Sequence, residues 1–151
     1  MSLRYRYKLF SVNHPVSTLR GRWVRPRPLI TVSVLGPAGV KVETGLLDAG
    51  ADDTVFPEDV ARAIGLDLTT APTGTFSGVG SGSIPLRYGE VSLRIAGPGE
   101  FREWKALVGF TAAPLRRPLL GFAGMMQFFT TTFHGDREEV ELAVNSLYPG
   151  T

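Results

Sequence analysis

One segment of the chain combines acidic residues with a turn that can hold a catalytic carboxylate. Residues 45–56 read GLLDAGADDTVF, so that an apolar run leads into Asp48 and the small residues Ala49, Gly50 and Ala51 follow. An acid on such a turn leaves its carboxylate at the end of a strand, where backbone amide groups of the loop can support it. A carboxylate placed there can activate a water molecule, provided that a second carboxylate lies close by.

A pair of neighbouring carboxylates has a defined acid–base chemistry. Two such groups about 3 Å apart cannot both be ionised, so they share one proton. One member then acts as a base towards water, and the other acts as an acid towards a carbonyl oxygen. On its local pattern alone, Asp48 also fits a second interpretation, an Asp that caps a turn at the end of a strand.

The residues that lead to Asp48 predict a β-hairpin. Residues 29–35 alternate, with branched apolar side chains on one face, and residues 40–47 form a second extended segment. The turn sequence GPAG at 36–39 separates the two. The chain has 18 Gly and 11 Pro residues, which favours many short strands joined by turns over a helical fold.

Two short helices and several more strands are expected along the rest of the chain. Residues 57–64 predict a helix, because Pro57 suits its first turn and Gly65 suits its end. The other expected elements are a strand within 5–12, a glycine-tipped hairpin at 76–86, strands at 90–95 and 103–108, a short helix within 122–129, and strands at 128–133 and 140–144.

Length and composition exclude several classes of protein. The chain has 151 residues, 43% hydrophobic and 20% charged, which suits one globular domain with a hydrophobic core. It has no cysteine, so that disulfides, a thiolate nucleophile and a Cys-ligated metal are excluded, and its two histidines are too few for a His-based metal site without carboxylates. No run of about 18 apolar residues and no signal peptide are found, so we expect a cytoplasmic protein without a membrane partner.

The charges are distributed unevenly along the chain. Residues 1–42 contain eight Lys or Arg residues and no acid, so that all 14 Asp and Glu residues lie in the remainder. We expect residues 1–26 to form a basic N-terminal arm that lies against an acidic body, its own or that of a partner. A nucleic-acid-binding arm is the alternative, which we do not favour because no nucleic-acid motif accompanies the charge.

Four motifs in order resemble those of the retropepsin-like family, the retroviral aspartic proteases and their cellular relatives. Residues 45–56 resemble the active-site loop of the family, and residues 27–32 (RPLITV) resemble the strand that opens its core. Residues 76–82 (FSGVGSG) resemble the tip of the flap. Residues 119–121 (LLG) resemble the element that packs beside the catalytic loop. The resemblance covers residues 27–133, and it favours catalysis over turn capping for Asp48.

The resemblance implies a fold, a reaction and a partner. It implies a mostly β, closed acid-protease barrel with two short helices over residues 27–151, acting as an endopeptidase on an extended polypeptide substrate without a cofactor. Because the chain contains one Asp loop, it implies a C2 homodimer in which each copy contributes Asp48. The residues that it assigns to substrate binding are Gly50, Asp52, Asp53, Gly78, Val79 and Gly80.

Two positions depart from the family pattern. The family has Thr or Ser after the catalytic Asp, and its hydroxyl bonds across the dimer axis, whereas this chain has Ala49. Many relatives have Arg after the LLG element, where it braces the active-site loop, and this chain has Phe122. Both departures weaken the expected dimer. They leave open a second hypothesis, a catalytically weakened or inactive peptide-binding or dimerisation module on the same fold.

Overall fold

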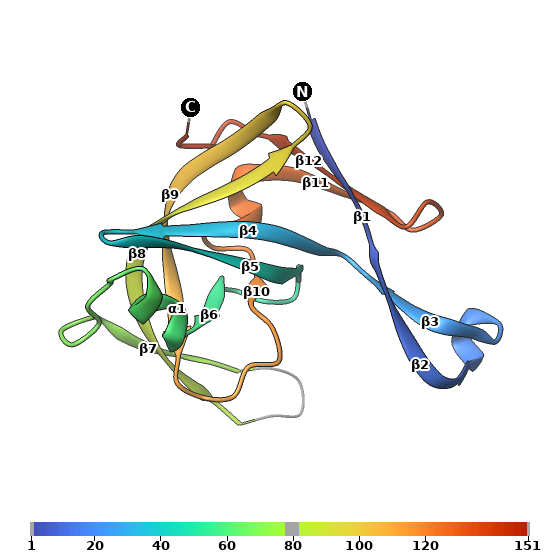
Figure 1. Ribbon diagram of the computed structural model, residues 1–151, viewed down its shortest axis with the longest axis horizontal. Helices are drawn as coiled ribbons and strands as arrows, with labels where there is room; N and C mark the ends of the chain where they lie inside the picture. The colour runs from blue at the N-terminus through green and yellow to red at the C-terminus, as the bar shows by residue number, and fades with distance from the viewer. Residues whose placement is uncertain (1, 78–81, 151) are drawn as a thin grey trace.

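The computed structural model describes residues 2–77 and 82–150, and strands account for most of it (Figure 1). The strands are β1 (Ser2–Arg6), β2 (Lys8–Val16), β3 (Arg22–Arg27), β4 (Leu29–Gly36), β5 (Gly39–Leu47), β6 (Val55–Pro57), β7 (Thr73–Phe76), β8 (Ile84–Gly97), β9 (Glu100–Thr111), β10 (Leu119–Leu120), β11 (Phe129–His134) and β12 (Glu139–Val144). The helical elements within this part are α1 (Glu58–Ala63) and the 3-10 turns η1 (Ser17–Leu19) and η2 (Met126–Phe128).

Six of these strands close into a barrel. Their order is β4-β5-β10-β6-β9-β8, and antiparallel pairing of β4 with β8 closes the ring, while β7 pairs with β8 outside it. Inward-facing residues of β4 are fully buried, as the alternation predicted: Ile30 is 1% exposed, and Val32 and Val34 are 0% exposed. The expectation of a mostly β, closed barrel is therefore confirmed at that level.

Strand β10 is inserted between two strands that follow each other in the sequence. It pairs parallel with β5, with Leu119 opposite Leu46 and Leu120 opposite Leu47, and antiparallel with β6. The chain therefore leaves β5, passes through the Asp48 loop and enters β6 on the far side of β10. A strand in this position fixes both ends of the loop at once, because it hydrogen-bonds to the strands on either side.

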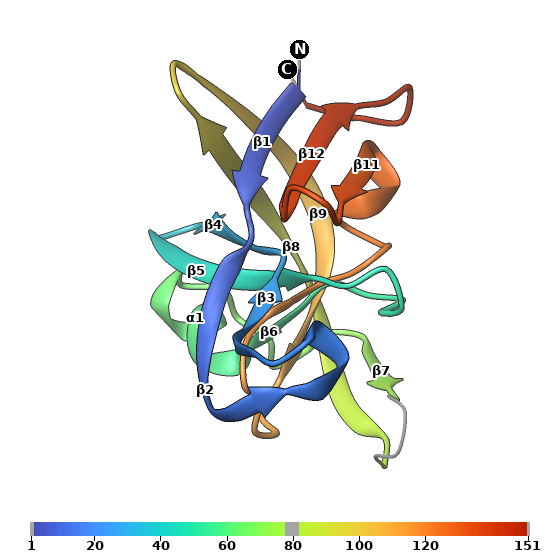
Figure 2. The ribbon, with the colours of Figure 1, turned by 90° about the vertical axis from the view of Figure 1, so that its right-hand side faces the viewer.

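A second sheet covers one end of the barrel. Strand β12 lies between β1 and β11, so that the two ends of the chain are paired, and the three strands lie side by side in Figure 2. Leu3 of β1 is 3% exposed, and Trp104 of β9 is 2% exposed. The indole of Trp104 packs edge-on against Phe129, with ring centroids 5.1 Å apart. Apolar and aromatic packing therefore anchors this sheet to the barrel.

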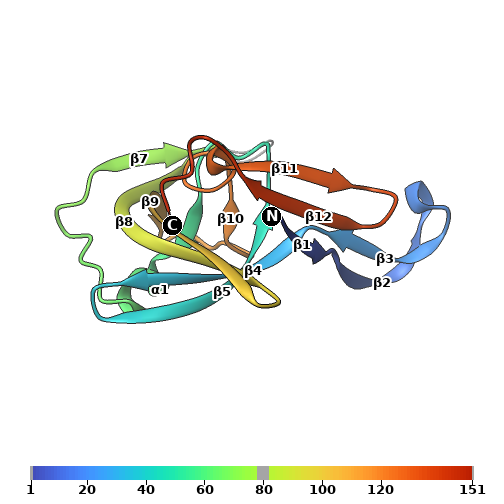
Figure 3. The same ribbon diagram turned by 90° about the horizontal axis from the view of Figure 1, so that it is seen from above.

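The basic N-terminal segment is divided between two structures. The strand predicted within residues 5–12 forms as parts of two strands. Strand pairing is interrupted at Tyr7, whose N–H donates to the Glu138 carbonyl at 2.7 Å. Strand β1 belongs to the terminal sheet, whereas β2 and β3 form a separate hairpin that projects from the barrel (Figures 1 and 3). Trp23 on this hairpin is 56% exposed.

The two helix predictions had different outcomes. Helix α1 forms beside Pro57 and ends before Gly65, whose φ is +72°, as the sequence indicated. The helix predicted within residues 122–129 was wrong, because only a three-residue 3-10 turn forms there. The reason is that backbone groups at Ala123 pair with the Asp48 loop and Phe129 already belongs to β11. Within the described residues, no helix is long and apolar enough to span a membrane.

Candidate functional site

The Asp48 loop begins where β5 ends, and backbone groups hold its first residues in place. The Asp48 N–H donates to the Leu120 carbonyl at 3.1 Å, which continues the pairing of β5 with β10 by one residue. The Gly50 N–H donates to Asp48 Oδ1 at 2.9 Å, and the Ala51 N–H donates to the Asp48 carbonyl at 3.1 Å. The half-buried Asp48 carboxylate is thus oriented by a loop amide, a contact that both the catalytic and the turn-capping interpretations of Asp48 predict.

The segment after β10 runs beside the loop and bonds to it along its length. The Phe122 N–H donates to the Ala51 carbonyl at 2.9 Å, and the Ala123 N–H donates to the Asp52 carbonyl at 2.8 Å. In the opposite direction, the Thr54 N–H donates to the Ala123 carbonyl at 3.1 Å. The sequence predicted that residues 119–121 lie beside the Asp48 loop. They lead directly into the segment that hydrogen-bonds to this loop.

Thr54 fastens these two segments together, and the sequence analysis did not single it out. Its side chain is 0% exposed, and its hydroxyl donates to the Ala123 carbonyl at 2.8 Å while accepting from the Gly121 N–H at 3.3 Å. The backbone carbonyl of Thr54 accepts from the Gly109 N–H at 2.9 Å. A buried hydroxyl needs hydrogen-bonding partners. The signal in the sequence was a polar Thr placed directly before the apolar residues of β6.

Gly121 packs against the loop so closely that no side chain fits. A Cβ at this position would lie 2.6 Å from the Ala51 carbonyl oxygen and would also meet the Asp53 carbonyl. These contacts are with backbone atoms, which cannot swing aside as a flexible side chain can. The glycine of the LLG motif is therefore required by the close approach of two backbones.

The two other acids of the loop have different surroundings. Asp52 is exposed, whereas Asp53 is half-buried and its Oδ2 accepts a hydrogen bond of 3.4 Å from the Tyr88 hydroxyl of β8. Burial raises the pKa of Tyr88, and the charge and hydrogen bond of Asp53 raise it further. Tyr88 was not identified from the sequence, because it is far from Asp53 along the chain and only the folded barrel brings the two side chains together.

Several small or apolar residues near Asp48 face solvent. Ala49 and Gly50 are exposed, and the side chain of Phe122 is 59% exposed although it follows the buried Gly121 directly. Gly78, Val79 and Gly80, which the resemblance assigned to substrate binding, lie outside the described residues. The strands that flank them are present, since β7 pairs with β8 as far as Phe76 opposite Ile84.

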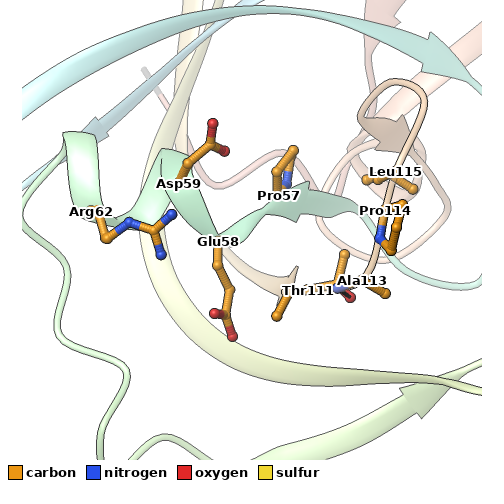
Figure 4. A pocket seen from close by; sticks show the side chains of 9 residues that line it. Pro57, Glu58, Asp59, Arg62, Thr111, Ala113, Pro114 and Leu115 are labelled. Atoms are coloured by element: carbon orange, nitrogen blue, oxygen red, sulfur yellow. Dashed lines mark hydrogen bonds between the residues drawn. The ribbon is translucent and has the colours of Figure 1, made fainter.

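A cavity of about 440 Å³ lies elsewhere, between α1 and the loop after β9 (Figure 4). Glu58 and Arg62 extend from the helix on one side of it, and Pro114 and Leu115 extend from the loop on the other. None of the acids of the Asp48 loop lines this cavity. It is therefore separate from the candidate site.

An acid–base pair of this kind would need two Asp loops, and one chain contains one of them. Each copy presents one oriented carboxylate at Asp48, and the sequence contains no second loop of this kind. A symmetric pair of chains would supply the second carboxylate.

No model of a known protein family matches the chain, and none of the curated proteins matches it in sequence.

Proposed function

We propose that the chain is an aspartic endopeptidase of the retropepsin type, active as a homodimer with one Asp48 from each copy. The observation that carries the proposal is the Asp48 carboxylate, which lies at the end of β5 and is oriented by the Gly50 amide. Insertion of β10 between β5 and β6 supports it further, because this arrangement fixes both sides of the Asp48 loop.

The proposed reaction uses the two Asp48 carboxylates as one unit. The ionised member accepts a proton from a water molecule, and the oxygen of that water attacks the carbonyl carbon of the peptide bond. The protonated member donates its proton to the carbonyl oxygen, which gives a tetrahedral diol. As the C–N bond breaks, one diol hydroxyl gives its proton to the ionised carboxylate and becomes the carbonyl of the new acid, while the leaving nitrogen takes up the proton of the other carboxyl group, so that the pair again shares one proton. The loop amide of Gly50 keeps Asp48 in position throughout.

The exposed surface beside Asp48 supports dimerisation. Phe122 presents an apolar ring to solvent at the position where many relatives carry Arg, and the exposed Ala49 and Gly50 lie on the adjoining loop. Burying one Phe side chain contributes about 1.5–3 kcal/mol. A two-fold axis would bury two copies of it, so this surface can form the dimer contact without an ion pair.

Phe122→Glu is expected to weaken the dimer at least about 100-fold, because each of two symmetric sites loses a buried ring and gains a charge. The free energy of unfolding of the monomer should change by less than about 0.5 kcal/mol, since the side chain is 59% exposed. Sedimentation equilibrium measures the first quantity and urea titration measures the second.

Val40→Glu is the matched control, because Val40 is 58% exposed and lies at the opposite end of β5 from Asp48. It should leave the dimer unchanged. Equal dimer dissociation constants for Phe122→Glu and the parent chain would contradict a contact through this surface.

Ala49→Thr is expected to strengthen both the dimer and cleavage. The new hydroxyl adds one hydrogen bond per copy across the axis, each contributing about 0.5–1.5 kcal/mol, so the dimer should be about 5- to 150-fold tighter. Incubation of the parent and the variant with a mixed peptide library at pH 4–7, followed by mass spectrometry, measures cleavage. Ala49→Ser is the matched control and should give a similar gain, whereas Ala49→Val, which lacks the hydroxyl, should not.

A second candidate function is a peptide-binding or dimerisation module on the same fold. The observation that favours it is Ala49, which leaves the loop without a side-chain hydrogen-bonding group next to Asp48. Cleavage by Ala49→Thr but not by the parent would identify Ala49 as the inactivating residue. Absence of cleavage by both proteins at every pH would contradict the endopeptidase and favour the module.

A further inference from the structure

A basic pocket lies beside the junction of β5 and β10. Its volume is about 260 Å³, and its lining residues are Arg27, Leu46, Leu115, Arg116, Arg117 and Leu119. Leu46 and Leu119 are register partners, so the base of the pocket is formed by the same strand pair that leads into the Asp48 loop. Three arginines and three leucines therefore line the pocket.

Two of the guanidinium groups are held in place by one aromatic ring. The guanidinium carbon of Arg27 lies 5.5 Å from the centroid of the Phe10 ring, and that of Arg117 lies 5.0 Å from it. Phe10 belongs to β2, opposite Arg25 in the projecting hairpin. Cation–π contacts with a shared ring limit the freedom of both side chains. The hairpin therefore helps to preorganise the pocket.

The positive charge of the pocket is not neutralised within the described part of the chain. There, no carboxylate forms an ion pair with Arg27, Arg116 or Arg117, whereas arginines elsewhere, such as Arg94 with Glu103 at 2.7 Å, do so. Burial lowers the pKa of Arg117, and the charges of Arg27 and Arg116 lower it further. Three neighbouring cations repel one another, and an anion placed among them would relieve that repulsion.

Leu46 of the pocket lies two residues before Asp48, which follows the end of β5 and continues its pairing with β10 by one residue. Successive side chains of a strand point to opposite faces, so Leu46 and Asp48 share a face while Leu47, 3% exposed, points into the core. Two residues along a strand span about 7 Å. An extended peptide that crosses Asp48 would therefore bring a side chain one to three residues from its cleaved bond to this pocket.

We propose that this pocket binds an acidic side chain of a peptide, so that the chain selects substrates with Glu or Asp within three residues of the cleaved bond. The proposal rests on the proposed function for the position of that bond. The three guanidinium groups bind the carboxylate, and Leu46, Leu115 and Leu119 pack against the methylene groups that precede it. Glu, with one more methylene than Asp, should be preferred.

The test uses pools of random octapeptides that carry Glu or Gln at one fixed position. Cleavage by the parent chain and Ala49→Thr is read by mass spectrometry. Binding is read separately, as enrichment of peptides on immobilised Asp48→Asn protein, which does not depend on catalysis. Both readouts should favour Glu over Gln by about tenfold or more at one position, as expected for a charge-assisted contact in a partly buried site.

Variants of the pocket should remove this preference. The double variant Arg116→Gln/Arg117→Gln should cleave and bind the Glu and Gln pools to within about twofold of each other, and Arg116→Glu should lower the preference for Glu by about as much, because the net charge of the three side chains falls from +3 to +1. Arg116 is exposed, so the single charge reversal should not affect folding, which thermal unfolding checks. Arg137→Gln, at an exposed position in the turn between β11 and β12, is the matched control and should behave as the parent.

The outcomes separate this proposal from the proposed function. If the parent cleaves and binds the Glu and Gln pools equally well, the pocket proposal is overturned. A preference in binding without cleavage by the parent or Ala49→Thr supports the pocket and contradicts the endopeptidase. Loss of self-association in the double variant, with no peptide preference in the parent, would assign the carboxylate to a second copy of the chain and would also overturn the proposal.

Discussion

Asp48→Asn should lower kcat/KM for peptide cleavage by at least about 1,000-fold in the parent chain and in the Ala49→Thr background. Positioned acid–base groups contribute about 100- to 10,000-fold, and an amide in place of one carboxylate removes the base of the shared pair. The fold should be retained, because the half-buried side chain accepts its hydrogen bond from the Gly50 N–H through an oxygen that Asn also has. Initial rates on a peptide identified from the library, with circular dichroism of both proteins, measure the two quantities.

Mixing the variant with the parent tests whether the two carboxylates work as one unit. If equal amounts exchange freely and associate at random, about one quarter of the dimers contain two Asp48 residues, so activity should fall to about 25% of that of the parent at the same total concentration. Independent active sites would retain 50% of that activity on the same reasoning. Asp59→Asn, an exposed acid of α1 that lines the separate cavity, is the control and should retain full activity.

Gly121→Ala should destabilise the fold by about 3 kcal/mol or more. The added methyl group would lie 2.6 Å from the Ala51 carbonyl oxygen, so that the segment after β10 must move away from the Asp48 loop. That movement would also stretch the bonds of the Thr54 hydroxyl, which is 0% exposed, so that solvent cannot replace them. Urea titration followed by Trp fluorescence measures the free energy of unfolding.

Gly135→Ala is the matched control, because a Cβ there would meet no atom within 4 Å. It should change the free energy of unfolding by less than about 0.5 kcal/mol. If Gly121→Ala were equally neutral, the interlocking of the Asp48 loop with the segment after β10 could not be as tight as described.

Local sequence patterns were sufficient for much of the barrel. The alternation of residues 29–35, with the GPAG turn, predicted the hairpin of β4 and β5, because side-chain direction in a strand repeats every two residues. Pro57 and Gly65 marked α1 through the backbone angles that they favour. The LLG motif and the Asp48 loop were identified as neighbours, although only by resemblance to a family.

Local patterns did not predict the structure where the backbone hydrogen-bonds to a segment far away in the sequence. Residues 122–129 have helix-compatible side chains, yet the peptide groups near Ala123 pair with the Asp48 loop, about 70 residues earlier, and a residue paired there cannot also bond within a helix. The strand predicted within residues 5–12 is divided for the same reason, since β1 pairs with β12 and β2 pairs with β3.

The sequence by itself determined that Asp48 ends a strand and that one chain carries one such acid. Only the tertiary structure decided what surrounds it: Thr54 bonded to Gly121, Tyr88 bonded to Asp53, and three arginines gathered beside Leu46. These groups come from β3, β5, β8, the loop between β5 and β6, and the segments before and after β10. Periodicity records which way a side chain points along its own strand, whereas contacts between distant segments depend on strand pairing, which no local pattern specifies.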